Sequence, residues 1–261
     1  MASVVKQFVE PICVHIFSSP ACSQESIEGL TYLMERLFQE TVLLREKSAE
    51  ELIIAVRERT LGRKKQLVVF PGSMTLKEWG FLGGHKDELL KLFKEDKLLM
   101  MGVCAGAFFL SKESVFNKRE REHTQYIPAF QGRVVGSLRE GLVPFGVEGY
   151  PITTEAVSCF GLTAKVAVLA GGYFEKLGEG DEVLASIEDK PVVIACSKKE
   201  AHYRALLITT HFELGLEALQ RQMQVFPQDI SKVQTMQSDL QESHTMRLQM
   251  MRLFLEKLGL K

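Results

Sequence analysis

Short apolar runs alternate along this chain with stretches whose apolar residues recur at helical spacing. Residues Ile12 to Phe17 and Gln66 to Phe70 are nearly continuous apolar runs, which is typical of buried strands. Between them, Ser23 to Gln39 has the 3.6-residue apolar repeat of an amphipathic helix, with Ser23 as its N-cap. The pattern therefore predicts that strands and helices alternate from the beginning of the chain.

The same alternation continues into the second quarter of the chain. A helix is expected over Asp87 to Lys94, and a second buried strand follows it over Leu98 to Val103. Two buried strands with a helix between them form a βαβ unit, in which the strands are parallel. Near the end, Val192 to Ala195 and Ala205 to Thr209 are expected to pair as a hairpin. These elements predict an α/β fold with a mainly parallel central sheet and helices on both faces.

The remaining segments give weaker signals. Val42 to Leu44 is expected to be a short strand, residues 117–188 contain short β-like pieces punctuated by glycines, and residues 214–261 are expected to be helical. Neither a linker nor a repeat divides the sequence. We therefore expect a single domain over residues 1–261, with a C-terminal helical extension from about residue 216.

Composition and charge exclude several classes of protein. The 261 residues are 46% hydrophobic and 25% charged, with a net charge of −1, which is ordinary for a globular protein and gives no bulk attraction to nucleic acid or anionic membranes. The longest nearly apolar run, Leu98 to Leu110, is shorter than the roughly 18 residues that a membrane helix needs. The first residues lack the pattern of a secretory signal. Neither a nucleic-acid partner nor a membrane partner is expected.

The five cysteines are scattered, and no two of them form a CxxC pair. This spacing disfavours both a disulfide framework and a zinc site, so we expect free thiols in a reducing cytoplasm and no bound metal. The glycine-rich segment around Gly83 and Gly84 lacks the spacing of a phosphate-binding loop. No cofactor is therefore expected.

The segment Gly102-Val103-Cys104-Ala105-Gly106 has the pattern of a nucleophile elbow, because it follows a buried strand and precedes a helix. Glycines allow the tight turn and the close approach of neighbouring backbones. The positive end of the helix dipole favours a thiolate at Cys104, and the Ala105 N–H could help to hold an oxyanion. The alternative is an ordinary core cysteine on a glycine-rich turn.

A cysteine nucleophile needs a base, and His211 is the candidate among six histidines because it alone follows a strand-like apolar run. Glu213 lies two residues later, on the same side of an extended chain, where it could orient the imidazole ring. A surface His–Glu pair is the alternative. The strand-end turn at Pro71, Gly72 and Ser73 could supply further oxyanion donors, although such turns are common.

Together these segments resemble the class I glutamine amidotransferases, which combine a Pro-Gly-Gly oxyanion turn, a Gly-x-Cys-x-Gly elbow and a late His-x-Glu. The resemblance implies a flavodoxin-like fold, with Cys104 as nucleophile, His211 as base and Glu213 as orienting acid. It also implies an oxyanion hole at Gly72, Ser73 and Ala105. Ser73 replaces the second glycine of the turn, and alanines follow the elbow where glutamine users often have Gln. Cysteine chemistry is therefore a firmer expectation than glutamine as the substrate.

A narrower resemblance is to the amidotransferase-like N-terminal domain of biotin–protein ligases and its free-standing bacterial relatives. The segment Ala170-Gly171-Gly172-Tyr173-Phe174 is similar to a Gly-Gly-x-Tyr-Phe segment of that family. Gly172 and Tyr173, together with the single tryptophan Trp79, are candidates to line a pocket. The biotin-ligase catalytic loop has no counterpart here, so the chain is not expected to be a complete biotin ligase.

Two functions from different classes remain open at this stage. The first is an enzyme that uses Cys104 covalently on a small-molecule or amide substrate, by hydrolysis or acyl transfer, with a possible protein partner. The second is a non-catalytic binding or regulatory module associated with biotin–protein ligation. The presence of Cys104, His211 and Glu213 favours the enzyme. A peptidase or deglycase is disfavoured, because no histidine follows the elbow before His123.

Overall fold

The computed structural model describes residues 5–60, 65–73, 84–95, 98–116, 119–122, 127–138, 152–197, 204–217 and 230–261. Trp79 lies outside these residues. The helices of the described residues are α1 (Gln24–Leu37), α2 (Ala49–Thr60), α3 (Lys86–Glu95), α4 (Ala105–Phe109), α6 (Ile230–Glu242) and α7 (His244–Lys257). The first strands are β1 (Ile12–Phe17), β2 (Thr41–Glu46), β3 (Lys65–Phe70), β4 (Leu99–Val103), β5 (Ser111–Phe116), β6 (Arg119–Glu122) and β7 (Phe130–Gly136). The later strands are β8 (Ile152–Cys159), β9 (Leu162–Leu169), β10 (Tyr173–Glu175), β11 (Asp181–Ile187), β12 (Lys190–Ser197) and β13 (Arg204–Ile208).

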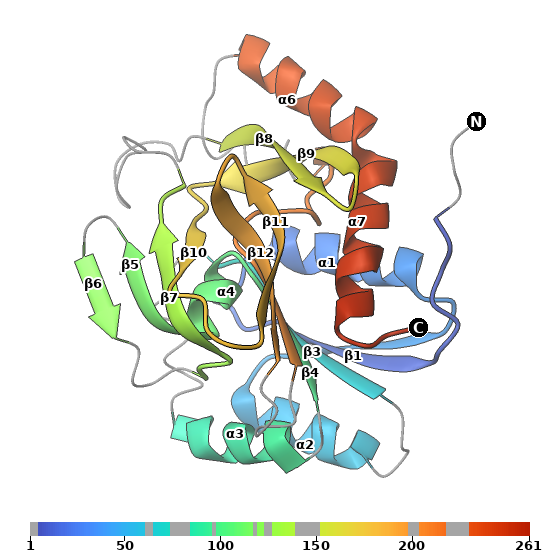
Figure 1. Cartoon of the computed structure of the whole chain (residues 1–261). Coiled ribbons are helices and arrows are strands. Elements are labelled where there is room, and N and C mark those ends of the chain that lie inside the picture. The colour runs from blue at the N-terminus through green and yellow to red at the C-terminus, as the bar shows by residue number, and fades with distance from the viewer. Residues whose placement is uncertain are drawn as a thin grey trace.

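The large sheet has the strand order β2-β1-β3-β4-β13-β12-β11-β8-β9 among the described residues (Figure 1). The strands from β2 to β13 in this order are parallel, as the βαβ pattern around β3 and β4 predicts. The expected hairpin partners β12 and β13 are antiparallel. Because β4 and β13 are parallel neighbours, their carboxyl ends lie at one edge of the sheet, where Cys104 and the segment before His211 follow them.

The expectation of a mainly parallel sheet is wrong, because β12, β11, β8 and β9 pair in antiparallel fashion. The connections explain the difference. β8 and β9 are joined only by Phe160 and Gly161, both of which have positive φ, as a tight hairpin turn requires. Two residues, Glu188 and Asp189, also join β11 to β12, and Glu188 has a positive φ. Two residues cannot make the long crossover that parallel strands need. The sheet is therefore mixed.

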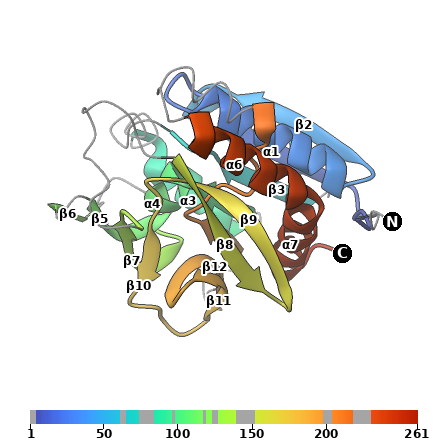
Figure 2. The same ribbon diagram turned by 90° about the horizontal axis from the view of Figure 1, so that it is seen from above.

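Helices cover both faces of the parallel strands (Figure 1). Helices α1 and α7 pack on one face, where Leu67 and Val69 of β3 are buried. Helices α2 and α3 lie on the opposite face, where the alternate residues Val68 and Phe70 are buried. This two-sided burial is why the strands are nearly continuous apolar runs. Helix α7 runs beside α1, as the view from above shows (Figure 2).

Local chemistry explains where α1 and α2 begin. The Ser23 side chain accepts a hydrogen bond from the Ser26 N–H (3.3 Å), so Ser23 caps α1 as its sequence predicts. The Ser48 hydroxyl accepts from the Glu51 N–H (3.2 Å) at the start of α2. Helix α2 has no counterpart in the sequence-based expectation.

A second sheet of four strands, in the order β10-β7-β5-β6, lies beside the large one (Figure 1). Strand β5 begins directly after α4, and the chain returns to this sheet through β10 before it enters β11. The side chains of Phe130 and Phe174 pack edge to face within this sheet. The second sheet is therefore connected through β5 to the helix that begins after Cys104.

Candidate functional site

Cys104 occupies the turn between β4 and α4. Its φ of 51° lies in the left-handed region, which a non-glycine residue adopts only when its surroundings hold it there. The Cys104 N–H donates to Ile208 O of β13 (2.8 Å), and the Ala107 N–H donates to Cys104 O (2.9 Å). The structure therefore places Cys104 in a strained strand-to-helix turn, and its side chain is only partly buried.

Both glycines of the elbow are explained by close backbone contacts. A Cβ atom on Gly102 would stand 2.6 Å from Gly106 O, and a Cβ atom on Gly106 would overlap the Phe70 carbonyl group. Real Cβ atoms do not approach other atoms so closely. The glycines thus allow α4 to pack directly against the ends of β4 and β3, which fixes the direction in which the turn presents Cys104.

His211 and Glu213 follow the neighbouring strand β13 and form a buried pair. The distance from His211 Nδ1 to Glu213 Oε1 is 2.8 Å, so the contact expected from their spacing is present. The His211 backbone N–H donates to Ala167 O of β9 (2.9 Å), which anchors the residue beyond the end of its strand. This leaves Nε2 as the ring nitrogen that is free to act on a neighbour.

The electrostatic surroundings favour the protonated form of His211. Burial acts to lower the pKa of His211, but the charges of Glu213 and Cys104 and the contacts with both side chains outweigh it and raise the pKa to about 10. Nε2 is buried and has no hydrogen-bond partner of ordinary geometry among the described residues, and the Cys104 side chain lies close to the ring. An imidazolium in this position stabilises a thiolate beside it.

Helix α1 also holds Glu213, at the same carboxylate oxygen that His211 contacts. The Ser26 hydroxyl donates to Glu213 Oε1 (2.8 Å), and a Cβ atom on Gly29 would stand 2.6 Å from Glu213 O. Sequence reasoning missed both residues. Ser26 lies 187 residues from Glu213 in the chain, and its own pattern indicates only the first turn of a helix.

The predicted oxyanion turn lies beside this pair. A Cβ atom on Gly72 would stand 3.1 Å from Cε1 of His211, and the Gly72 N–H donates to the Ser26 hydroxyl (3.0 Å). The Ser73 hydroxyl donates to Ala21 O (2.5 Å). Ala105 is the first residue of α4, so its N–H has no acceptor within the helix. The role of Gly72, Ser73 and Ala105 in holding an oxyanion stays a prediction.

Arg247 of α7 supports the same segment from a third direction. Its side chain is buried and donates to the carbonyl groups of Phe212 (3.0 Å) and Leu214, which flank Glu213, and to Leu240 O (3.1 Å). Burial lowers the pKa of Arg247 to about 10, and the nearby charge of Glu213 partly offsets this effect. A motif would not reveal this residue, because it contacts backbone carbonyls that every residue possesses.

Gly172 and Tyr173 lie near the site but outside the cavity found there. The Thr209 hydroxyl, two residues before His211, donates to Gly172 O (2.6 Å), and Lys190 Nζ lies 5.1 Å from the centre of the Tyr173 ring. The first contact connects the Gly-Gly-Tyr-Phe segment to the residues that follow β13, and the second connects it to β12. Trp79, the third candidate, is outside the described residues.

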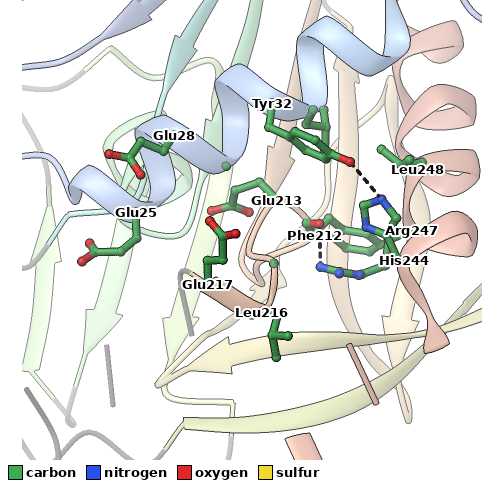
Figure 3. Close-up of a pocket in the computed structure, with 13 residues that line it drawn as sticks. Glu25, Glu28, Tyr32, Phe212, Glu213, Leu216, Glu217, His244, Arg247 and Leu248 are labelled. Carbon is green, nitrogen blue, oxygen red and sulfur yellow. Dashed lines mark hydrogen bonds between the residues drawn. The ribbon is translucent and has the colours of Figure 1, made fainter. Parts of the chain in front are cut away.

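A cavity of about 470 Å³ lies on the α1 and α7 side of Glu213. It is lined by residues of three segments, namely Glu25, Glu28, Gly29, Tyr32, Leu33, Phe212, Glu213, Gly215, Leu216, Glu217, His244, Arg247 and Leu248. Glutamate side chains surround one part, and Tyr32, His244 and Leu248 surround another (Figure 3). Cys104 does not line it, so the cavity lies behind the pair formed by His211 and Glu213.

Within the described ranges, no group of three or more histidine, cysteine, aspartate or glutamate side chains could hold a metal ion. None of the helices in these ranges is long and apolar enough to cross a bilayer. None of the five cysteines forms a disulfide in the structure.

Two known proteins are similar to this chain in sequence, although it matches no family model. The pyridoxal 5'-phosphate synthase subunit PdxT of Thermus thermophilus is 31% identical over 147 residues, which cover 54% of this chain and 69% of that protein. PdxT of Pseudothermotoga lettingae is 31% identical over 158 residues, which cover 60% of this chain and 76% of that protein. The similarity thus extends over more than two thirds of both relatives.

Two solved structures share the fold. One is a glutamine amidotransferase with a TM-score of 0.57 and 22% identity, matched over 95% of this chain and 99% of that one. The other is a glutamine amidotransferase from Thermotoga maritima with a TM-score of 0.56 and 14% identity, over 97% and 99% of the two chains. At such identities the likeness concerns the fold alone. The narrower resemblance to biotin–protein ligase domains stays a prediction.

The sequence relatives and the shared fold agree with the elbow at Cys104 and the late His211–Glu213 pair. The chain therefore belongs to the class I glutamine amidotransferase-like family that includes the PdxT subunits of pyridoxal 5'-phosphate synthase.

Proposed function

We propose that this chain is a glutaminase subunit, which hydrolyses the side-chain amide of glutamine through a covalent intermediate on Cys104. The observation that carries the proposal is the arrangement of Cys104, in a strained turn, beside a buried His211 whose Nδ1 contacts Glu213 (2.8 Å). The raised pKa of His211 supports an imidazolium beside Cys104 at neutral pH.

The proposed reaction follows from the positions of these groups. The Cys104 sulfur attacks the amide carbon, and the oxyanion that forms is held by backbone N–H groups, with Ala105 as the first candidate. His211 gives its proton to the leaving nitrogen, and the C–N bond breaks to release ammonia and leave a thioester. His211 then takes a proton from a water molecule, whose oxygen displaces the sulfur. The products are glutamate and ammonia, and Cys104 is regenerated.

A protein partner that consumes the ammonia is part of this proposal. The PdxT relatives are named as subunits of a synthase, which supports a subunit role for this chain as well. The absence of a disulfide among the five cysteines supports a reducing compartment such as the cytoplasm. An association with biotin–protein ligation, implied by the Gly-Gly-Tyr-Phe segment, is a second candidate for the partner's chemistry.

The test uses the glutamine analogue 6-diazo-5-oxo-norleucine, which alkylates the nucleophile of glutamine-binding sites. We expect one adduct on Cys104 by peptide mass spectrometry, protection by free glutamine, and a lower rate in His211→Ala. The same experiment with iodoacetamide at different pH values separates thiolate reactivity from glutamine recognition. If glutamine does not slow the labelling of Cys104, glutamine is refuted as the substrate. If Cys104 reacts like an ordinary thiol, and His211→Ala does not change its rate, the non-catalytic module is favoured.

A further inference from the structure

The hydroxyl group of Ser26 connects the acid of the site to the predicted oxyanion turn. It donates to Glu213 Oε1 (2.8 Å) and accepts from the Gly72 N–H (3.0 Å). Ser26 is only 1% exposed, so both contacts are shielded from water. Two segments that are far apart in the sequence, residues 71–73 and 211–213, therefore meet at one side chain of α1.

The geometry at Glu213 makes the Ser26 contact important for His211. Both Ser26 and His211 Nδ1 contact the same oxygen, Oε1, each at 2.8 Å. The last torsion of a glutamate side chain is broad, so a single hydrogen bond leaves the carboxylate free to turn. A second donor, fixed on a capped helix, removes this freedom and keeps Oε1 directed at the imidazole ring.

The same hydroxyl fixes the turn next to His211. The Gly72 backbone lies against the His211 ring, since a Cβ atom there would stand 3.1 Å from Cε1. Its N–H is held by Ser26, while Gly72 O accepts from the Ser23 N–H (2.8 Å). The position of the ring therefore depends on α1 through Glu213 and through Gly72.

We propose that Ser26 is a positioning residue of the Cys104 site, which holds Glu213 and the Gly72 turn in the arrangement that directs the His211 ring at Cys104. This proposal adds a residue to the proposed function, and the effect of Ser26 on catalysis rests on that function. Ser26 acts through Glu213 and Gly72 and has no role in bond formation. A merely structural serine would contribute to folding without affecting the protonation of His211.

The test compares Ser26→Ala with Ser26→Thr in the 261-residue chain. The readouts are the pKa of His211 from an NMR titration and the iodoacetamide rate of Cys104 as a function of pH. In Ser26→Ala the carboxylate is less well held, so we expect a lower pKa for His211 and a Cys104 rate about tenfold lower near neutral pH. Ser26→Thr retains a hydroxyl group and should restore both values. With glutamine, kcat should fall while KM changes little.

Ser23→Ala is the matched control on the same helix. It removes the cap of α1 (Ser23 Oγ to Ser26 N–H, 3.3 Å) and leaves both donors to Glu213 in place. We expect lower thermal stability with an unchanged pKa of His211. If Ser26→Ala shows this same result, with stability reduced and His211 unaffected, the positioning role is overturned.

The titration of His211 needs no turnover, so it tests Ser26 even if the chain hydrolyses no glutamine. Failure of the proposed function would appear in the unaltered chain as a Cys104 that glutamine does not protect. Failure of the Ser26 proposal would appear only in the comparison of variants. If Ser26→Ala does not fold, Ser26→Cys takes its place, because a thiol is similar in size but a weak donor. The pKa of His211 and the Cys104 alkylation rate in Ser26→Cys then test the positioning role in the same way.

Discussion

The backbone of Gly106 lies directly against the carbonyl group of Phe70, with no room for a side chain between them. This contact joins the start of α4 to the end of β3, and so joins the elbow of Cys104 to the turn at Gly72. We predict that Gly106→Ala separates these segments and lowers the free energy of unfolding by about 3 kcal/mol or more. Urea denaturation measures the loss.

Gly84→Ala is the control for this substitution, because a Cβ atom on Gly84 would meet no atom within 4 Å. It should change the free energy of unfolding by less than about 0.5 kcal/mol. Equal stabilities for the two alanine variants would show that the elbow has more space than its backbone contacts indicate.

Glu213→Gln keeps the size of the side chain and removes its charge. Because the charge of Glu213 is a main cause of the raised pKa of His211, we expect this pKa to fall in the variant. The fraction of imidazolium near neutral pH decreases, and Cys104 alkylation should slow by about a hundredfold. Glu217→Gln, which alters a second carboxylate on the cavity but has no contact with His211, is the control. A titration of His211 that is the same in both variants would contradict the assigned cause.

His15 is a second buried histidine, remote from Cys104. Its Nδ1 lies 2.8 Å from Glu46 Oε1, and its Nε2 lies 2.8 Å from Gln66 Oε1. Both ring nitrogens face acceptors, so both must donate, which requires the charged form. Burial acts to lower the pKa of His15, but contacts and charges from Cys13 and Glu46 outweigh it and raise the pKa from 6.5 to about 9.

This protonation predicts a pH-dependent stability. A group whose pKa is higher in the folded state stabilises fully below its unfolded value, about 6.5, and loses that contribution as the pH rises through about 9. We expect His15→Asn to cost about 3 kcal/mol more at pH 6 than at pH 10. Chemical denaturation at pH 6 and at pH 10 measures this difference in unfolding free energy. The control is His85→Asn, in a histidine that is partly exposed. A penalty that does not change with pH would mean that His15 is neutral in the fold.

Arg247→Met removes the donors to the Phe212 and Leu214 carbonyls while it preserves an apolar side chain of similar length. The carbonyls then remain buried without partners, so we expect a loss of about 2–4 kcal/mol in unfolding free energy. The matched control is Arg252→Met on the same helix, where the pair with Glu256 is partly exposed and contributes about 0.5 kcal/mol. Similar losses in both variants would argue against a special role for Arg247.

The sequence predicts the parallel half of the large sheet because each of its strands is an apolar run bounded by turn or helix signals. β1, β3 and β4 lie where the pattern places them, within one or two residues. The antiparallel half is different, because β11 pairs with β8. Two strands, β9 and β10, separate these partners in the chain, and nothing local encodes the choice. The pattern does not single out helix α2, although Leu52, Ile53 and Val56 are buried on one side of it.

In the candidate site, too, local sequence patterns reveal some residues, whereas others depend on distant partners. Cys104, His211 and Glu213 follow strand ends and carry a recognisable spacing, so the order of residues along the chain is enough to single them out. Ser26 and Arg247 could not be found in this way, because their partners are distant in sequence or are backbone carbonyls. The expected single domain over residues 1–261 and the C-terminal extension from about residue 216 stay predictions.

The pairing between β4 and β13 places Val103 opposite Ile208, one residue before Cys104 and three before His211. Loss of one residue from either strand would shift this alignment by about 3.3 Å and turn the following side chain to the other face of the sheet. Apolar exchanges at positions 99–101 and 103 leave the alignment intact, whereas Gly102 must remain a glycine for the elbow to form. Apart from Gly102, variation among homologous chains should therefore respect the length of these two strands more strictly than the identity of the residues within them.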